Sequence, residues 1–223
     1  AALYPLPEGR RPEPVDTRRR LSEIAAKHRD LYGVLWAVDE ADPDGVVEDW
    51  LDRNRYKVLD EWRGNVRLAL WAAARQPVVT VGRMPVAFGD ELQLTSLRYG
   101  PGQARPGDTI TLEAVWLTSE VAPAADYRVF LHLVDGVGAM TAQRDMAPVG
   151  GSARTSAWAP AGAAGRKPGE GEGGGPTERH VDRMGLRVPA DAAPGEHRLL
   201  LGLYDPATGR RLPVRPAGGG PSA

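Results

Sequence analysis

The chain has 223 residues, of which 42% are hydrophobic and 26% charged, so it can bury a real core and is not a disordered tail. Its 28 basic and 29 acidic residues leave a net charge of −1, which gives no electrostatic reason to expect binding to nucleic acid or to an anionic membrane. Cysteine is absent, which excludes disulfides, thiolate metal sites and a cysteine nucleophile.

The first third of the chain alternates helical and extended patterns. Its apolar start at Leu3 and Tyr4 is what we expect of a fragment of a longer protein. The predicted elements are a helix from a cap at Asp16 or Thr17 to about residue 31, a buried strand 34–38, a helix 46–55 capped by Asp44, and extended segments 57–62 and 65–73. This order predicts a small, incomplete α/β unit over 1–76 with parallel pairing, in the manner of a partial Rossmann-like fold.

The rest of the chain predicts short strands separated by turns. A linker is expected at 77–85, and then strands over 86–99, 109–118, 127–134, 139–145, 181–188, 197–204 and 211–214. This pattern predicts an antiparallel β-sandwich of immunoglobulin-like size over 86–215, and therefore an α+β chain overall. The Gly-rich stretch 159–177 is predicted to be a flexible surface insert and 216–223 a disordered tail.

One hairpin is predicted at the centre of the sandwich. Apolar residues of both parities in 129–134 are typical of a strand covered on both faces. The Asp135-Gly136 pair that follows is a strong turn signal, because glycine tolerates the positive φ that tight turns need.

The acidic loop after the first strand is one candidate site. Asp39, Glu40 and Asp42 follow a predicted parallel strand, where α/β folds often bind ligands, and paired carboxylates can act as acid and base or hold a divalent cation. The favoured interpretation is that Asp44 caps the next helix and the other acids are solvated. The spacing does not match an EF-hand.

Tryptophan gives the second candidate site. Trp36, Trp50 and Trp116 lie on apolar faces and are predicted to be core, whereas Trp158, beside the Gly-rich stretch, is the tryptophan most expected to be exposed. There it would be either a packing plug at the sandwich edge or a platform on which a sugar ring stacks. The four histidines have no metal-ligand spacing, and no serine stands in a GxSxG motif. No catalytic residue, metal site or cofactor is therefore predicted.

Several stretches resemble the soluble C-terminal region of bacterial polytopic glycosyltransferases, the dolichyl-phosphate-mannose–protein mannosyltransferase-like family of C-type fold. The matching stretches are 4–8 (YPLPE), 31–51 and 65–71 (NVRLALW) in the α/β unit, then 88–94 (FGDELQL), and farther along the sandwich 104–116, 126–135, 142–148 and 193–214. The resemblance implies an extracytoplasmic, bacterial accessory region that contacts the membrane domain of its parent and a glycan or lipid-linked sugar. The catalytic acids of the family lie in that membrane domain, so none is carried over. Arg154-Thr155 stands where the family is expected to have a Pro-Thr pair.

Three functions remain open from the sequence. The chain is a non-catalytic, glycan-binding or glycan-presenting accessory region of a membrane glycosyltransferase-like protein, or a structural, protein-interaction module of the cell envelope without sugar binding. The third is a stand-alone enzyme that uses Asp39, Glu40 and Asp42, which requires their carboxylates to converge in a pocket. An uncovered apolar face on the α/β unit would favour the interaction module.

Overall fold

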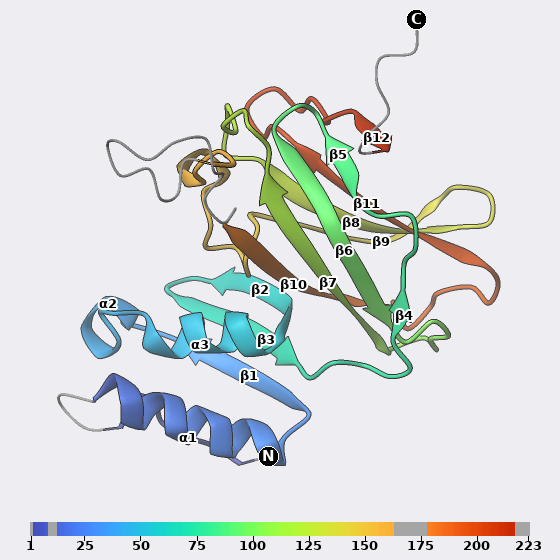
Figure 1. Cartoon of the computed structure of the whole chain (residues 1–223). Helices are drawn as coiled ribbons and strands as arrows, with labels where there is room; N and C mark the ends of the chain where they lie inside the picture. Colours follow the sequence, from blue (N-terminus) through green and yellow to red (C-terminus); the bar gives the residue numbers. More distant parts are fainter. Residues whose placement is uncertain (1, 9–12, 163–177, 217–223) are drawn as a thin grey trace, which may run out of the picture.

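The computed structural model describes residues 2–8, 13–162 and 178–216, and strands dominate it (Figure 1). The helical elements are α1 (Pro14–Lys27), α2 (Val38–Ala41), α3 (Val46–Asn54) and the 3-10 turn η1 (Thr155–Ala157). The strands are β1 (Asp30–Leu35), β2 (Tyr56–Arg63), β3 (Val66–Ala72), β4 (Val79–Thr80), β5 (Val86–Phe88), β6 (Leu92–Gly100), β7 (Thr109–Thr118), β8 (Arg128–Asp135), β9 (Met140–Met146), β10 (Arg179–Arg187), β11 (His197–Tyr204) and β12 (Val214–Pro216).

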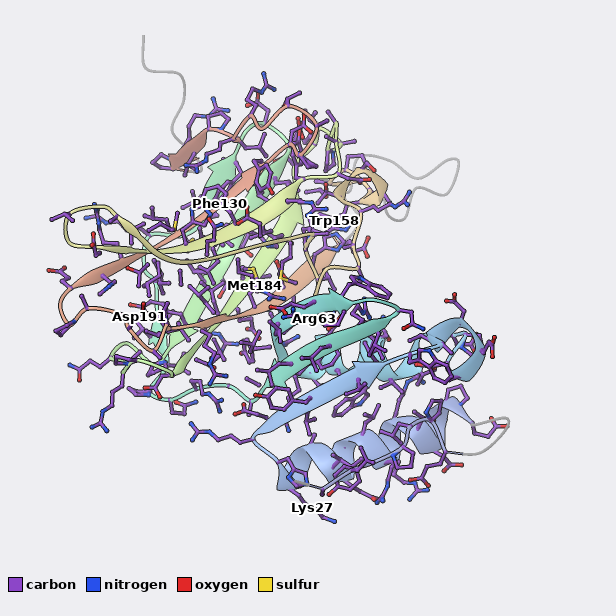
Figure 2. All side chains as sticks on the ribbon, turned by 180° about the vertical axis from the view of Figure 1, so that it is seen from behind. Lys27, Arg63, Phe130, Trp158, Met184 and Asp191 are labelled. Atoms are coloured by element: carbon purple, nitrogen blue, oxygen red, sulfur yellow. The ribbon has the colours of Figure 1, made fainter. Side chains whose placement is uncertain are left out.

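The strands form two β-sheets. The larger sheet has the order β1-β3-β2-β10-β7-β6-β5-β12, with β4 also paired to β6, and the smaller has the order β11-β8-β9. The two sheets enclose the main core between them, and Met184 lies in this layer (Figure 2). The chain is thus α+β with a β-sandwich, as predicted; the smaller sheet is antiparallel, and the larger sheet is mixed because β2 and β10 run parallel.

Within the sandwich, local pattern located the strands well. The predicted strands 109–118 and 197–204 are β7 and β11 to the residue, and β8 is the central strand of its sheet. The predicted strand 86–99 is instead two strands, because a turn with Gly89 at φ 59° separates β5 from β6. Most of the Gly-rich insert (163–177) and of the tail (217–223) lies outside the described residues.

The hairpin after β8 forms as predicted, but a different glycine takes the positive φ. Gly138, not Gly136, has the positive φ, at 90°. The Asp135 carboxylate accepts the backbone N–H groups of Val137 (3.0 Å) and Ala139 (2.8 Å), and this fixes the turn.

The N-terminal unit differs from the prediction in its helix and strand boundaries. Helix α1 begins at Pro14, after Glu13, rather than at Asp16 or Thr17, because proline is favourable in a first helical turn. It ends at Lys27, and β1 occupies 30–35 instead of 34–38. A Cβ on Gly33 would lie 2.7 Å from the Trp71 ring, so the absence of a side chain lets that tryptophan pack across β1.

The predicted parallel, Rossmann-like pairing of this unit is wrong. Strand β3 lies between β1 and β2 and is antiparallel to both. The reason is the tight turn at Gly64-Asn65, with Gly64 at φ 64°, because a two-residue connection can join only antiparallel strands.

The N-terminal unit and the sandwich share one continuous sheet. Strand β2 lies parallel to β10, with Lys57 opposite Met184. A Cβ on Gly185 would overlap Val58, so the two strands come close where β10 has no side chain. The segment 77–85, predicted as a linker, contains β4, which pairs with β6.

Candidate functional site

The acidic candidate residues do not converge. Asp42 accepts the N–H groups of Val46 (3.0 Å) and Val47 (2.9 Å) and so caps α3, the role predicted for Asp44. Asp39 and Glu40 lie on α2 with exposed side chains. Within the described residues, no group of three or more histidine or acidic side chains is placed to hold a metal ion.

Trp158 is buried, contrary to its expected exposure. Its ring is 7% exposed, packs into the main core, and stacks on His180 with the ring centroids 3.7 Å apart and the planes 4° from parallel. A sugar would need an accessible ring face, and this one is taken up by packing. Burial also lowers the pKa of His180, which keeps the stacked imidazole neutral at pH 7.

A buried ionic cluster joins the N-terminal unit to the sandwich. Lys57, which is 2% exposed, donates from Nζ to Asp52 (2.9 Å), to Glu48 (2.8 Å) and to the carbonyl of Gly150 (2.6 Å). Trp71 Nε1 donates to the second oxygen of Asp52 at 2.6 Å. We call Lys57, Asp52 and Glu48 the Lys57 cluster.

The sandwich contributes its own charged groups to this junction. Asp182 on β10 is fully buried and accepts the N–H of Val149 at 3.0 Å. Arg144 on β9 donates to the carbonyl of Val58 at 2.7 Å. Burial raises the pKa of Asp52 to about 6 and that of Asp182 to about 7. Because Lys57 bonds to Asp52 and Glu48, and Asp182 and Arg144 bond to the backbone, we assign the junction a structural role, although Asp182 Oδ2 is buried without a hydrogen-bond partner among the described residues.

The site with an open surface is one face of β1. Tyr32 and Val34 alternate with inward-facing residues of β1, and Trp36 follows Leu35, the last residue of the strand; these three side chains are 63%, 69% and 64% exposed. Helices α1 and α3 pack on the other face, against Trp71 and Ala69, whereas Figure 2 shows the open face. We call Tyr32, Val34 and Trp36 the β1 face.

On the neighbouring strand β3, the half-buried Leu68 lies opposite Val34 and extends this apolar surface. Leu70, opposite Tyr32, is only 4% exposed and packs against Val58 and Ala72. Strand β1 is also the last strand of the larger sheet, so no strand of the described chain pairs with its outer edge. Large apolar side chains beside an unpaired strand edge are a common site of protein–protein contact.

The sequence contains a signal for this surface. Tyr32, Val34 and Trp36 recur every second residue, the period of a half-buried strand, but the predicted boundaries, a helix to about residue 31 and a strand 34–38 with Trp36 in the core, divide this row. Trp36 is in fact exposed, whereas Trp116 is buried as predicted.

The described part of the chain contains no helix that is both long and apolar enough to cross a membrane. Comparisons with protein-family models, with curated proteins and with solved structures each gave no match.

Proposed function

We propose that this chain is a non-catalytic protein-interaction module that binds an extended, apolar segment of a partner protein at the β1 face. The observation that carries the proposal is a set of three large apolar side chains, each more than 60% exposed: Tyr32 and Val34 on β1, a strand with an unpaired edge, and Trp36 directly after it. Isolated exposed apolar residues are ordinary, but an alternating row beside open backbone groups is a feature that proteins normally cover.

The chemistry of the face favours an extended partner. A strand added beside β1 would satisfy the free backbone groups of the edge, while Tyr32 and Trp36 would contact its alternate side chains. Covering the exposed parts of these two rings would remove on the order of 250 Å² of apolar surface from water, worth about 6 kcal/mol before the entropic cost of association.

The resemblance to the membrane glycosyltransferase family extends this proposal. On that view the partner is the membrane domain of the parent protein, and the module lies on the extracytoplasmic side of a bacterial membrane. The paired antiparallel sheets of the sandwich are in keeping with an immunoglobulin-like scaffold. Sugar presentation through Trp158 gains no support from a ring that is 7% exposed.

Site-specific photo-crosslinking in cells tests the proposal. A photoreactive residue at Val34, on the β1 face, should give a discrete adduct with a second polypeptide, identified by mass spectrometry. The matched control is the same residue at Val137, which is 91% exposed on the β8–β9 hairpin and far from β1 in the sheet order. Replacing Trp36 by serine should weaken the Val34 adduct.

Two results would contradict the proposal. One is equal crosslinking at Val34 and Val137, which would mean that the β1 face is ordinary surface. The other is an undiminished Val34 adduct in the Trp36→Ser variant. An adduct with a protein that is not a membrane glycosyltransferase would support docking and refute the extension drawn from the resemblance.

A further inference from the structure

A second feature, independent of the β1 face, is a cleft of about 700 Å³. It lies beside the residues that begin β1, whereas Trp36 follows the other end of that strand. The chain that leaves β3 runs toward β4 and the ends of β6 and β7 (Figure 1), and Arg75, Gln76 and Pro77 on this segment line the cleft. Its charged lining residues are Arg29, Asp30, Arg75, Asp108 and Arg187. The volume falls within the range of sites for small organic ligands.

Arg75 is the residue that makes this cleft unusual. It is only 8% exposed, and its Nη2 donates to Asp30 at 2.5 Å. Its Nη1 is buried and has no hydrogen-bond partner in the described chain. A buried guanidinium nitrogen without an acceptor is costly, so an acceptor from a ligand would be favourable here.

The backbone around Arg75 is fixed in place. Its N–H donates to Thr111 Oγ1 at 2.9 Å, and that hydroxyl donates to the carbonyl of Gly100 at 3.2 Å. A Cβ on Gly100 would lie 2.4 Å from the Arg75 carbonyl oxygen, so the two segments are in close contact. The arginine therefore projects from a rigid support, which lowers the entropic cost of binding.

The local charge is positive. Arg29 and Arg187 have exposed side chains and form no ion pair within the described residues, whereas Asp30 is paired with Arg75. A further arginine, Arg55, interacts with Arg75 and Asp30. Burial lowers the pKa of Arg55, Asp30 raises it, and the positive charge of Arg75 lowers it. Asp108 is already an acceptor for the N–H of Arg105 at 2.8 Å. The lining of the cleft thus contains three arginines and two aspartates, and both aspartates already accept hydrogen bonds from the chain.

We propose that this cleft binds a small, hydroxylated organic anion, with a phosphate or carboxylate group held by Arg75 and Arg187. Guanidinium forks match these oxyanions in geometry and charge. Gln76 and Gln103, which also line the cleft, supply amide donors and acceptors for hydroxyl groups. Sugar phosphates and sugar acids combine both features.

Titration calorimetry on the whole chain at low ionic strength tests this assignment. The probes are inorganic phosphate, glucose 6-phosphate, glucuronate and uncharged glucose. We expect saturable binding of the two charged sugars, weaker binding of inorganic phosphate, and none of glucose. Affinity for the charged sugars should fall as sodium chloride is raised, because the attraction is screened.

Two variants and one control locate the site. Arg187→Gln removes an exposed, unpaired cation and should weaken binding of glucose 6-phosphate by about tenfold. Arg75→Lys keeps a positive charge beside Asp30 but loses the fork, and it should also weaken binding. Arg179→Gln removes an exposed arginine from the opposite end of the same strand and should leave the affinity unchanged.

The relative affinities of glucose 6-phosphate and glucuronate decide between a phosphate and a carboxylate ligand, and binding of either one is expected to require Arg187. Binding of glucose as tight as that of its phosphate would overturn the proposal, as would no binding by any probe. Equal losses in Arg187→Gln and Arg179→Gln would show only general attraction to positive charge and would also overturn it. Circular dichroism on each variant separates loss of the site from loss of the fold.

Discussion

Replacing Asp182 by asparagine should change how the stability of this protein depends on pH. The Asp182 carboxyl is fully buried, and burial raises its pKa from 3.8 to about 7, although Arg144 and the amides of Val149 and Gly150 oppose the shift. Asp52 nearby adds to the rise. At pH 5 the folded protein therefore keeps this group protonated and neutral, whereas the unfolded chain ionises it.

The magnitude follows from linkage. A carboxyl whose folded pKa is raised contributes stability that is full below its unfolded pKa and is lost as pH rises through its folded pKa. With pKa values of about 4 unfolded and about 7 folded, raising the pH from 5 to 8 should lower the free energy of unfolding by about 2.5 kcal/mol. Asparagine has nearly the same shape and does not titrate, so Asp182→Asn should lack this loss.

Urea unfolding followed by circular dichroism at pH 5, 6, 7 and 8 measures the difference. Other groups titrate in both proteins, so the quantity of interest is the gap between wild type and variant, which should grow in favour of Asp182→Asn as pH rises. Asp191→Asn, at an exposed position, is the control and should follow wild type. Parallel curves for wild type and Asp182→Asn would refute the reasoning, because Asp182 would then be ionised throughout.

Three further substitutions test other contacts. Asp42→Ala removes both cap bonds of α3 and should cost about 1 kcal/mol in urea unfolding, and an unchanged midpoint would refute the capping role. Lys57→Met leaves the buried carboxylates of the Lys57 cluster without their cation and should cost about 3–5 kcal/mol, whereas a neutral effect would mean that the cluster is not needed to join the two units. Gly202→Ala should cost about 1–3 kcal/mol in thermal unfolding, because the new Cβ would lie 2.2 Å from the Phe130 ring. The control is Gly82→Ala, which has open space around it and should be neutral. Equal effects of the two substitutions would exclude a clash with Phe130.

The strands of the sandwich could be predicted because their signals are local. In β7, the alternation from Ile110 to Trp116 and the turn residues on either side define the strand without reference to any distant partner. The Asp135 turn is also local, although the sequence did not tell which of its two glycines takes the positive φ.

Pairing and burial depended on residues far apart in the chain. Antiparallel order in the N-terminal unit follows from β3 lying between β1 and β2, and Trp36 is exposed where the chain leaves β1, the last strand of the larger sheet. No local pattern reveals which strand is last in a sheet. The same limit applies to Trp158, which was expected to be exposed because of its Gly-rich neighbours and is covered by His180 from β10.

The sequence alone determined the α+β class, most strand positions of the sandwich and the absence of a recognisable catalytic motif, because these depend on composition and short-range period. Only the tertiary structure brought Lys57 to the Gly150 carbonyl, 93 residues away, and Arg75 to Asp30, 45 residues away. A charged side chain has no periodicity of its own. Whether it is solvated, buried in an ion pair or turned toward a cleft is decided by which distant segments the packing of the apolar residues brings beside it.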